Sequence, residues 1–202
     1  MFKIIFLNIA VAFAFILPAK AQFLHSYGAT IGITRATEVF NYDNSDLRQE
    51  MGYRTGFNGS LFLEFFNHNV FTWVMEAQFN QFGSRWLGTE GEEIFKNRLN
   101  YGSFNNSLKA RAEGIDMNLY VLAGPRVKYL ISSNSNDFPS PHVYSDFAFA
   151  VSGGLGMDLN FFEPVILFAE VQYIQGIFGS SDVPQYTQSK GLEIRIGIKK
   201  RI

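Results

Sequence analysis

Three histidines, His25, His68 and His142, are the side chains of this sequence best suited to metal or acid–base chemistry. The chain has no cysteine, which excludes a thiol nucleophile, a disulfide and a cysteine-ligated metal. His68 falls in a short turn and His142 in a polar loop, at opposite ends of the strands predicted below. The two imidazoles therefore cannot converge on one ion, and we predict no metal site.

His142 also lies near Asp137 and Ser140, so one loop carries the residue types of a nucleophilic triad. A serine, a histidine and an aspartate close together in a polar loop are usually only loop residues, because a triad also needs a defined relative geometry. We predict no catalytic residue here and expect that the protein is not an enzyme.

Three acids, Glu76, Glu170 and Glu193, could supply the paired carboxylates of a hydrolase. They share their predicted face with arginines, and acids opposed to arginines more often form structural ion pairs. The glycine-rich run 153–156 does not lead from a strand into a helix, as a phosphate-binding loop requires. We interpret these glycines as residues that let a sheet curve tightly, and we predict no cofactor.

The first 21 residues have the pattern of a secretory signal peptide. Lys3 precedes an apolar run at 4–17, and Ala19-Lys20-Ala21 forms a small-residue cleavage site. The apolar run is shorter than the roughly 20 residues of a transmembrane helix. We therefore predict cleavage after Ala21 and export of residues 22–202 as one domain.

Apolar and polar residues alternate with a period of two through most of the remaining chain. The clearest case is the segment 146–176, whose first arm sets apolar residues at odd positions against small or polar residues at even ones. The short connection Phe162-Glu163-Pro164 returns the chain into a second arm. Each arm exceeds the about 9–11 residues that a tilted strand needs to cross a bilayer, so we predict a transmembrane β-hairpin.

The same pattern predicts further strands, at about 23–35, 51–66, 70–83, 115–131 and 189–201. Asn58-Gly59 is a potential hairpin turn, but the alternation keeps its phase through it and favours one continuous strand. The segment 98–111 alternates poorly. We predict a fourth strand there because a single-chain membrane barrel needs an even number of strands.

With that strand included, short and long connections alternate along the chain. The short ones are 67–69, 112–114 and 162–164, and the long ones are 36–49, 84–97, 132–142 and 179–188. This asymmetry is typical of barrels with short periplasmic turns and longer external loops.

Charged residues fall on the predicted inner face of these strands. Because hydrocarbon offers no partner to an unpaired backbone group, the sheet must close, and eight strands leave an interior that side chains fill. Acids and bases are nearly balanced there, so mutual pairing would neutralise the lumen and no open pore is expected. The predicted inward-facing charges are Arg54, Glu64, Glu76, Arg126, Lys128, Asp158, Glu170, Glu193 and Arg195.

Overall composition agrees with such strands. The mean hydropathy of +0.02 is too low for a helical bundle in lipid, but it suits strands that place every second residue in a polar environment. The net charge is −1, and no clustered basic surface indicates a nucleic-acid partner.

Four segments resemble strands of the Bacteroidetes-type outer-membrane β-barrel family that includes the PorT proteins. They are 119–132, 146–156, 170–176 and 192–198, which are similar to that family's fifth, sixth, seventh and last strands. The resemblance implies an eight-stranded antiparallel up-and-down transmembrane β-barrel in contact with outer-membrane lipid. It further implies a structural or interaction role, as an accessory to envelope assembly or to protein secretion of type IX.

Two other interpretations stay open at this point. A soluble lipocalin-like binding barrel would carry apolar residues inside and polar ones outside, so the positions of Arg126 and Glu193 separate it from a membrane barrel. An outer-membrane enzyme acting on lipid or peptide would depend on His142, and replacing that residue tests it.

Overall fold

The computed structural model describes residues 23–42, 48–50, 52–66, 70–87, 93–136, 145–162, 164–178 and 185–202. The predicted signal peptide and the predicted turn at 67–69 lie outside these residues. No helix in the described ranges is long and apolar enough to cross a membrane.

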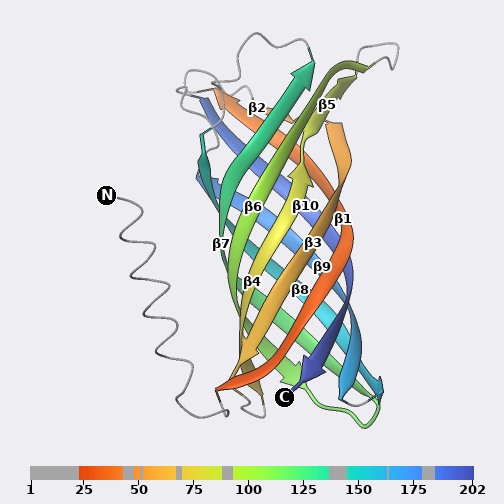
Figure 1. The fold of residues 1–202 in the computed structure, drawn as a ribbon. Helices are drawn as coiled ribbons and strands as arrows, with labels where there is room; N and C mark the ends of the chain where they lie inside the picture. Colours follow the sequence, from red (N-terminus) through yellow and green to blue (C-terminus); the bar gives the residue numbers. More distant parts are fainter. Residues whose placement is uncertain are drawn as a thin grey trace.

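Eight long antiparallel strands form a closed barrel (Figure 1). They are β1 (Leu24–Tyr42), β3 (Gly52–Phe65), β4 (Phe71–Phe82), β6 (Glu93–Ala112), β7 (Met117–Asn136), β8 (Phe147–Phe162), β9 (Val165–Phe178) and β10 (Gln185–Arg201). Consecutive long strands pair with each other, and β1 pairs with both β3 and β10, which closes the sheet. The predicted eight-stranded up-and-down architecture is confirmed.

Two short strands extend this barrel at the end that carries the long connections. β2 (Arg48–Glu50) pairs with β1, and β5 (Ser84–Leu87) pairs with β3 and β6. Both add backbone hydrogen bonds around the rim of the barrel.

The strand predicted weakly at 98–111 is present, and β6 is longer than predicted, at 20 residues. Its pattern is poor because Gly102 and Asn106 stand among the outward positions while Leu99 and Tyr101 point inward, where both are buried. Pairing with β4 and β7 over most of its length supplies the order that the hydrophobic pattern lacks.

Several predicted loops were wrong at their ends, because the strands continue farther outward. β1 reaches Tyr42 and β7 reaches Asn136, whereas β6 already begins at Glu93, β10 at Gln185, and β5 occupies 84–87. A strand beyond the membrane needs no apolar face, so polar composition alone misplaced these boundaries. Asn58 and Gly59 lie inside β3, which confirms one continuous strand there.

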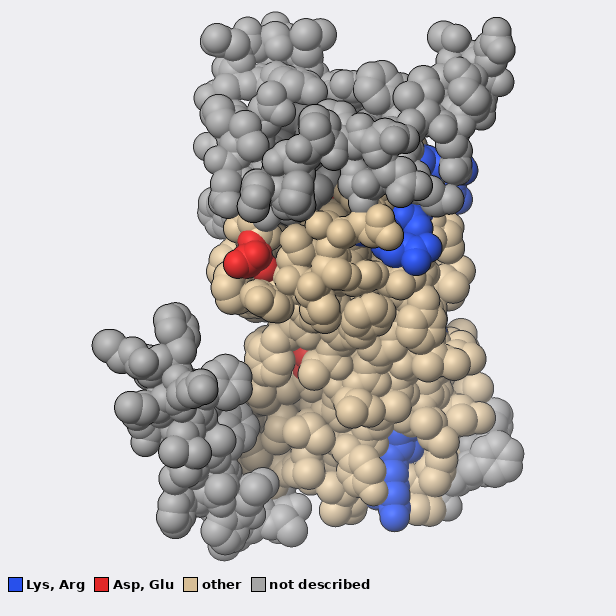
Figure 2. Space-filling view, turned by 45° about the horizontal axis from the view of Figure 1, so that its top comes forward, with Lys and Arg blue, Asp and Glu red and all other residues tan. Residues whose placement is uncertain are grey.

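The apolar faces of the strands point outward. Phe149, Leu167 and Ile196 are 48%, 41% and 60% exposed, whereas Arg126 and Glu193 are fully buried inside the barrel. This orientation is that of a membrane barrel, and it excludes the lipocalin-like alternative, which required the opposite arrangement. Figure 2 shows one face of the outer surface as a broad zone with few charged atoms, with lysine and arginine atoms near its two ends and an acidic patch near the upper end.

The last strand shows the height of this apolar belt. Leu192, Ile194, Ile196 and Ile198 occupy the outward face of β10 between Lys190 and Lys200. At about 3.4 Å per residue, the ten steps from Lys190 to Lys200 cover about 34 Å along the strand. Because the strands of such barrels are tilted by about 35–45°, this length corresponds to an apolar band about 25 Å tall.

Inside the barrel, three aromatic rings each cover a glycine on the neighbouring strand. Phe62 lies opposite Gly28, Tyr120 opposite Gly156, and Phe168 opposite Gly197. A Cβ atom at any of these glycines would overlap the ring that faces it. The glycines therefore let large rings lie flat against the wall of a narrow lumen.

Arginine in the middle of the belt should destabilise the barrel. Leu155 and Val171 are cross-strand partners on the outer face of β8 and β9. We expect Leu155→Arg and Val171→Arg each to lower the unfolding free energy in lipid vesicles by about 2–4 kcal/mol. Leu192→Arg is the matched control, because Leu192 pairs with Arg35 near the edge of the belt, where the cost falls to about 0–1 kcal/mol. Equal stability of all three variants would contradict the orientation described here.

Candidate functional site: the charged lumen

A fully buried ion pair crosses the middle of the lumen. Arg126 on β7 donates from Nη1 to Oε1 of Glu193 on β10 at 3.1 Å, and its Nη2 donates to Gln172 on β9 at 3.0 Å. Glu193 also accepts hydrogen bonds from Gln78 at 3.1 Å and from Asn80 at 3.2 Å, both on β4. Four strands are thereby joined through one carboxylate and one guanidinium.

Arg195 forms a second bridge toward the short-turn end. Its guanidinium donates to Glu76 on β4 at 2.6 Å and to Glu170 on β9. Asn105 donates to Glu76 at 2.7 Å, and the Tyr120 hydroxyl donates to Glu170 at 3.0 Å. All four carboxylate oxygens of Glu76 and Glu170 therefore accept a hydrogen bond. The two acids lie on either side of the Arg195 cation.

A third cluster of two lysines and two acids lies nearest the short turns. Lys109 contacts Glu64 at 2.9 Å, and Lys199 contacts Asp158 at 2.8 Å and Glu64 at 3.3 Å. Ser26 donates a further hydrogen bond to Glu64 at 2.5 Å. Because removing one member would leave an opposite charge buried, the cluster acts as a unit.

An apolar layer closes the other end of the lumen. Phe82, Leu99, Tyr101, Ala150 and Ile174 pack together there with Ala36. The Lys128 ammonium enters this layer, 4.6 Å from the ring centre of Phe82 and 5.0 Å from that of Tyr101. Its Nζ donates to Ser189 Oγ at 2.5 Å, so aromatic faces and one hydroxyl hold the cation.

Side chains fill the lumen along the strands that the structure describes. A small space lies between the Arg195 bridge and the lysine cluster, lined by Glu64, Glu76, Tyr120 and Arg195 among others. Its volume is about 20 Å³, which is room for roughly one water molecule. Cations and carboxylates balance along its length. The cations are Lys109, Arg111, Arg126, Lys128, Arg195 and Lys199, and the carboxylates are Glu38, Glu64, Glu76, Asp158, Glu170 and Glu193.

Eight of the nine charges predicted to face inward are buried in the lumen. The ninth, Arg54, is half-buried near the outer rim, where it donates to the Asn97 carbonyl at 2.5 Å. Four buried charges were not among those predicted. Lys109 and Arg111 lie on β6, whose sequence alternates weakly, and Lys199 lies inside on β10. Glu38, predicted to lie in a loop, is buried in β1 and accepts a hydrogen bond from Ser84 at 2.8 Å.

Of the residues whose types could do chemistry, His25, Glu76, Glu170 and Glu193 lie in the described part of the chain. His25 is buried at the start of β1, and His68, His142, Asp137 and Ser140 lie outside the described residues. Within the described ranges, no group of three or more histidines and acids could hold a metal ion. Glu76 and Glu170 do converge, but on Arg195, which makes them ion-pair partners.

Comparison with known families agrees with this geometry. The family described as outer membrane protein beta-barrel domain matches residues 21–182. The chain therefore belongs to this family of outer-membrane barrels. No curated protein matches the sequence.

Solved structures show the same fold at low sequence identity. The outer membrane protein OprG from Pseudomonas aeruginosa is 12% identical with a TM-score of 0.58, over 90% of this chain and 97% of that one. Neisserial surface protein A is 13% identical with a TM-score of 0.54, over 87% and 97%. The outer membrane protease OmpT from Escherichia coli is 8% identical with a TM-score of 0.50, over 90% and 98%. At these identities the likeness shows the fold alone.

Removing one member of the central ion pair should destabilise the barrel strongly. We expect Glu193→Leu to lower the unfolding free energy by about 3–5 kcal/mol, because Arg126 is left buried with no carboxylate partner. Combining it with Arg126→Met should recover much of the loss. The measurement is urea unfolding in lipid vesicles.

Asp116→Leu provides the control for this pair. Asp116 is exposed in the short connection between β6 and β7, so its loss should change stability by less than about 1 kcal/mol. A double variant as unstable as Glu193→Leu alone would show that the ion pair is not the source of the effect.

Proposed function

We propose that this protein is a small closed barrel of the outer membrane with a structural or interaction role, and that it neither conducts solutes nor catalyses a reaction. The observation that carries the proposal is the sealed lumen, in which Arg126 and Glu193 are fully buried across the centre. The space between the Arg195 bridge and the lysine cluster has room for roughly one water molecule, which offers no path for a solute.

The outer rim supports an interaction role. β6 and β7 stay paired as far as Lys96 and Asn136, and β1 and β10 as far as Tyr42 and Gln185. These paired ends extend beyond the level of Arg35, near the edge of the apolar belt, and project together at the top of the barrel (Figure 1). They form a supported platform for the external connections.

The finer assignment is to an accessory of envelope assembly or of type IX protein secretion, as in the PorT-like proteins. It rests on the resemblance of segments 119–132, 146–156, 170–176 and 192–198 to strands of that family. The same proposal includes export through a signal peptide cleaved after Ala21.

Reconstitution tests the closed barrel. We expect the protein to fractionate with the outer membrane, to migrate differently on a gel before and after heating, and to give no steady current in a planar bilayer. A porin reconstituted alongside serves as the positive control. Stepwise conductance from the folded protein would contradict the sealed lumen.

A deletion strain of the source organism tests the accessory role. We expect loss of the gene to reduce protein export or envelope integrity, and the wild-type chain to restore it. His142→Ala should restore it equally well, because no catalytic role is assigned to this residue. If His142→Ala failed to complement the deletion and the envelope lipids or peptides were altered, the interpretation as an outer-membrane enzyme would be favoured instead.

A further inference from the structure

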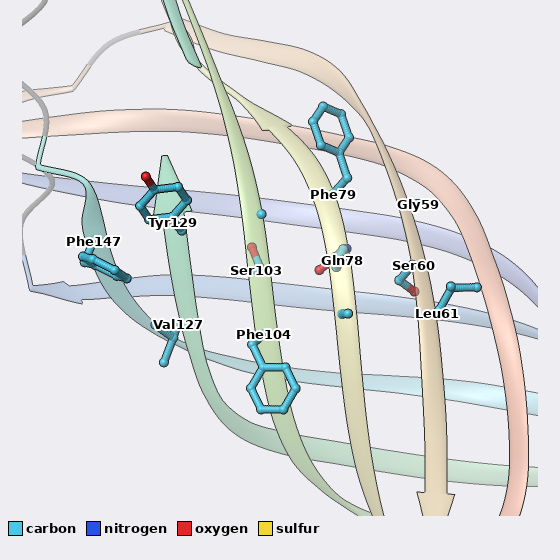
Figure 3. Close-up of a pocket in the computed structure, with 12 residues that line it drawn as sticks. Gly59, Ser60, Leu61, Gln78, Phe79, Ser103, Phe104, Val127, Tyr129 and Phe147 are labelled. Carbon is cyan, nitrogen blue, oxygen red and sulfur yellow. The ribbon is translucent and has the colours of Figure 1, made fainter. Parts of the chain in front are cut away.

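The lipid-facing surface of β3, β4, β6, β7 and the start of β8 carries a shallow, open apolar hollow of about 810 Å³. Leu61, Phe79, Phe104, Val127, Tyr129 and Phe147 form its walls. Figure 3 shows Phe79 and Phe104 projecting in opposite directions from β4 and β6, with Leu61 beyond β4 and Tyr129 and Phe147 on the other side. The hollow lies on the outside of the barrel and is separate from the charged lumen.

Small residues alternating with large ones create the hollow. Gly59 lies opposite Phe79, and Phe79 in turn lies opposite Gly102 on the next strand. One step along the strands, Ala77 lies opposite both Leu61 and Phe104. Phe79 and Phe104 therefore each stand beside a glycine or alanine on a neighbouring strand.

The glycines of this hollow are not required by packing within the chain. A Cβ atom at Gly59 would meet nothing nearer than the Phe57 ring at 3.4 Å, and one at Gly102 nothing nearer than Ile131 at 3.4 Å. This differs from Gly156 and Gly197 in the lumen, which aromatic rings cover. The outward glycines instead leave space for something that comes from outside the protein.

The height of the hollow in the membrane indicates what fills it. Gly102 directly follows Tyr101, which belongs to the apolar layer at the outer end of the lumen. Arg98 is exposed on the same outward face of β6, four residues farther out. That separation is about 13 Å along the strand, or about 10 Å across the membrane once the strand tilt is included, so the hollow and Arg98 fit within one hydrocarbon leaflet of roughly 15 Å.

We propose that the hollow binds one phosphate-bearing lipid of the outer leaflet, with an acyl chain between Phe79 and Phe104 and its phosphate on the Arg98 guanidinium. The apolar walls exclude a polar occupant at this depth, and a guanidinium is suited to hold a phosphate through paired hydrogen bonds. The inference rests on the proposed outer-membrane role and extends it by naming the lipid class.

A second hollow provides an internal control. It has a volume of about 510 Å³ and lies on β1, β8, β9 and β10, lined by Ala29, Leu159, Leu167, Ala169, Ile196 and Ile198. It lies toward the short-turn end, because Ala29 and Ile198 stand beside Tyr27 and Lys200. An outer-leaflet lipid should therefore not depend on it.

Native mass spectrometry of the purified full chain in detergent, titrated with lipid A, tests the proposal. We expect one lipid A bound per wild-type barrel. Gly102→Leu, which fills the hollow, and Arg98→Gln, which removes the cation, should each weaken the apparent affinity about tenfold. Dephosphorylated lipid A should bind the wild type as weakly as lipid A binds Arg98→Gln. Ala169→Leu should bind like the wild type.

Heat-modifiable migration of every variant establishes that the barrels compared are folded. Equal affinity in Gly102→Leu, Arg98→Gln and the wild type would overturn the proposal, as would an equal loss in Ala169→Leu. A two-copy species that disappears in Gly102→Leu would also overturn it, by showing that a second barrel occupies the hollow. Failure of membrane fractionation or a steady conductance would instead contradict the proposed function, since neither depends on this hollow.

Discussion

The need to pair every backbone N–H and C=O within hydrocarbon governs this structure. Eight strands meet that need only because β1 pairs with β3 on one side and with β10 on the other. Once the sheet is closed, each strand has one face toward lipid and one toward a narrow lumen. The period-two alternation of the sequence is the direct expression of that division, and β10 shows it most clearly, with isoleucines outside and Glu193, Arg195 and Lys199 inside.

The narrow lumen explains why charge is buried at all. An eight-stranded barrel has no room for bulk water, so inward polar residues must satisfy one another. Arg126 and Arg195 each link acids or amides from distant strands. Nearer the short turns, the lysine cluster links Glu64 and Asp158 in the same way. Desolvation makes such pairs weak sources of net stability, but it makes each partner indispensable to the other. The lumen thus behaves as a single polar core whose members hold neighbouring strands in register.

Glycine has two different roles on the two faces of the wall. Inside, Gly28, Gly156 and Gly197 lie under aromatic rings, and packing within the chain accounts for them. Outside, Gly59 and Gly102 have room for a larger side chain, and they leave a hollow next to Phe79 and Phe104. The proposed lipid site follows from this contrast, because only an external occupant gives the outward glycines something to accommodate.

The sequence by itself determined the strand count, the outward direction of the apolar faces and most of the lumen charges, because period-two alternation records directly which face meets lipid. The strand near 98–111, whose hydrophobic alternation is poor, was placed correctly only because a single-chain membrane barrel needs an even number of strands. The outer ends of the strands, the burial of Glu38 and the partners of Lys109 were decided by tertiary structure alone. Beyond the membrane no apolar face is needed, so pairing with neighbours sets where β1, β7 and β10 end. Which charges meet across the lumen depends on barrel stagger, which relates residues far apart in the chain and leaves no local pattern.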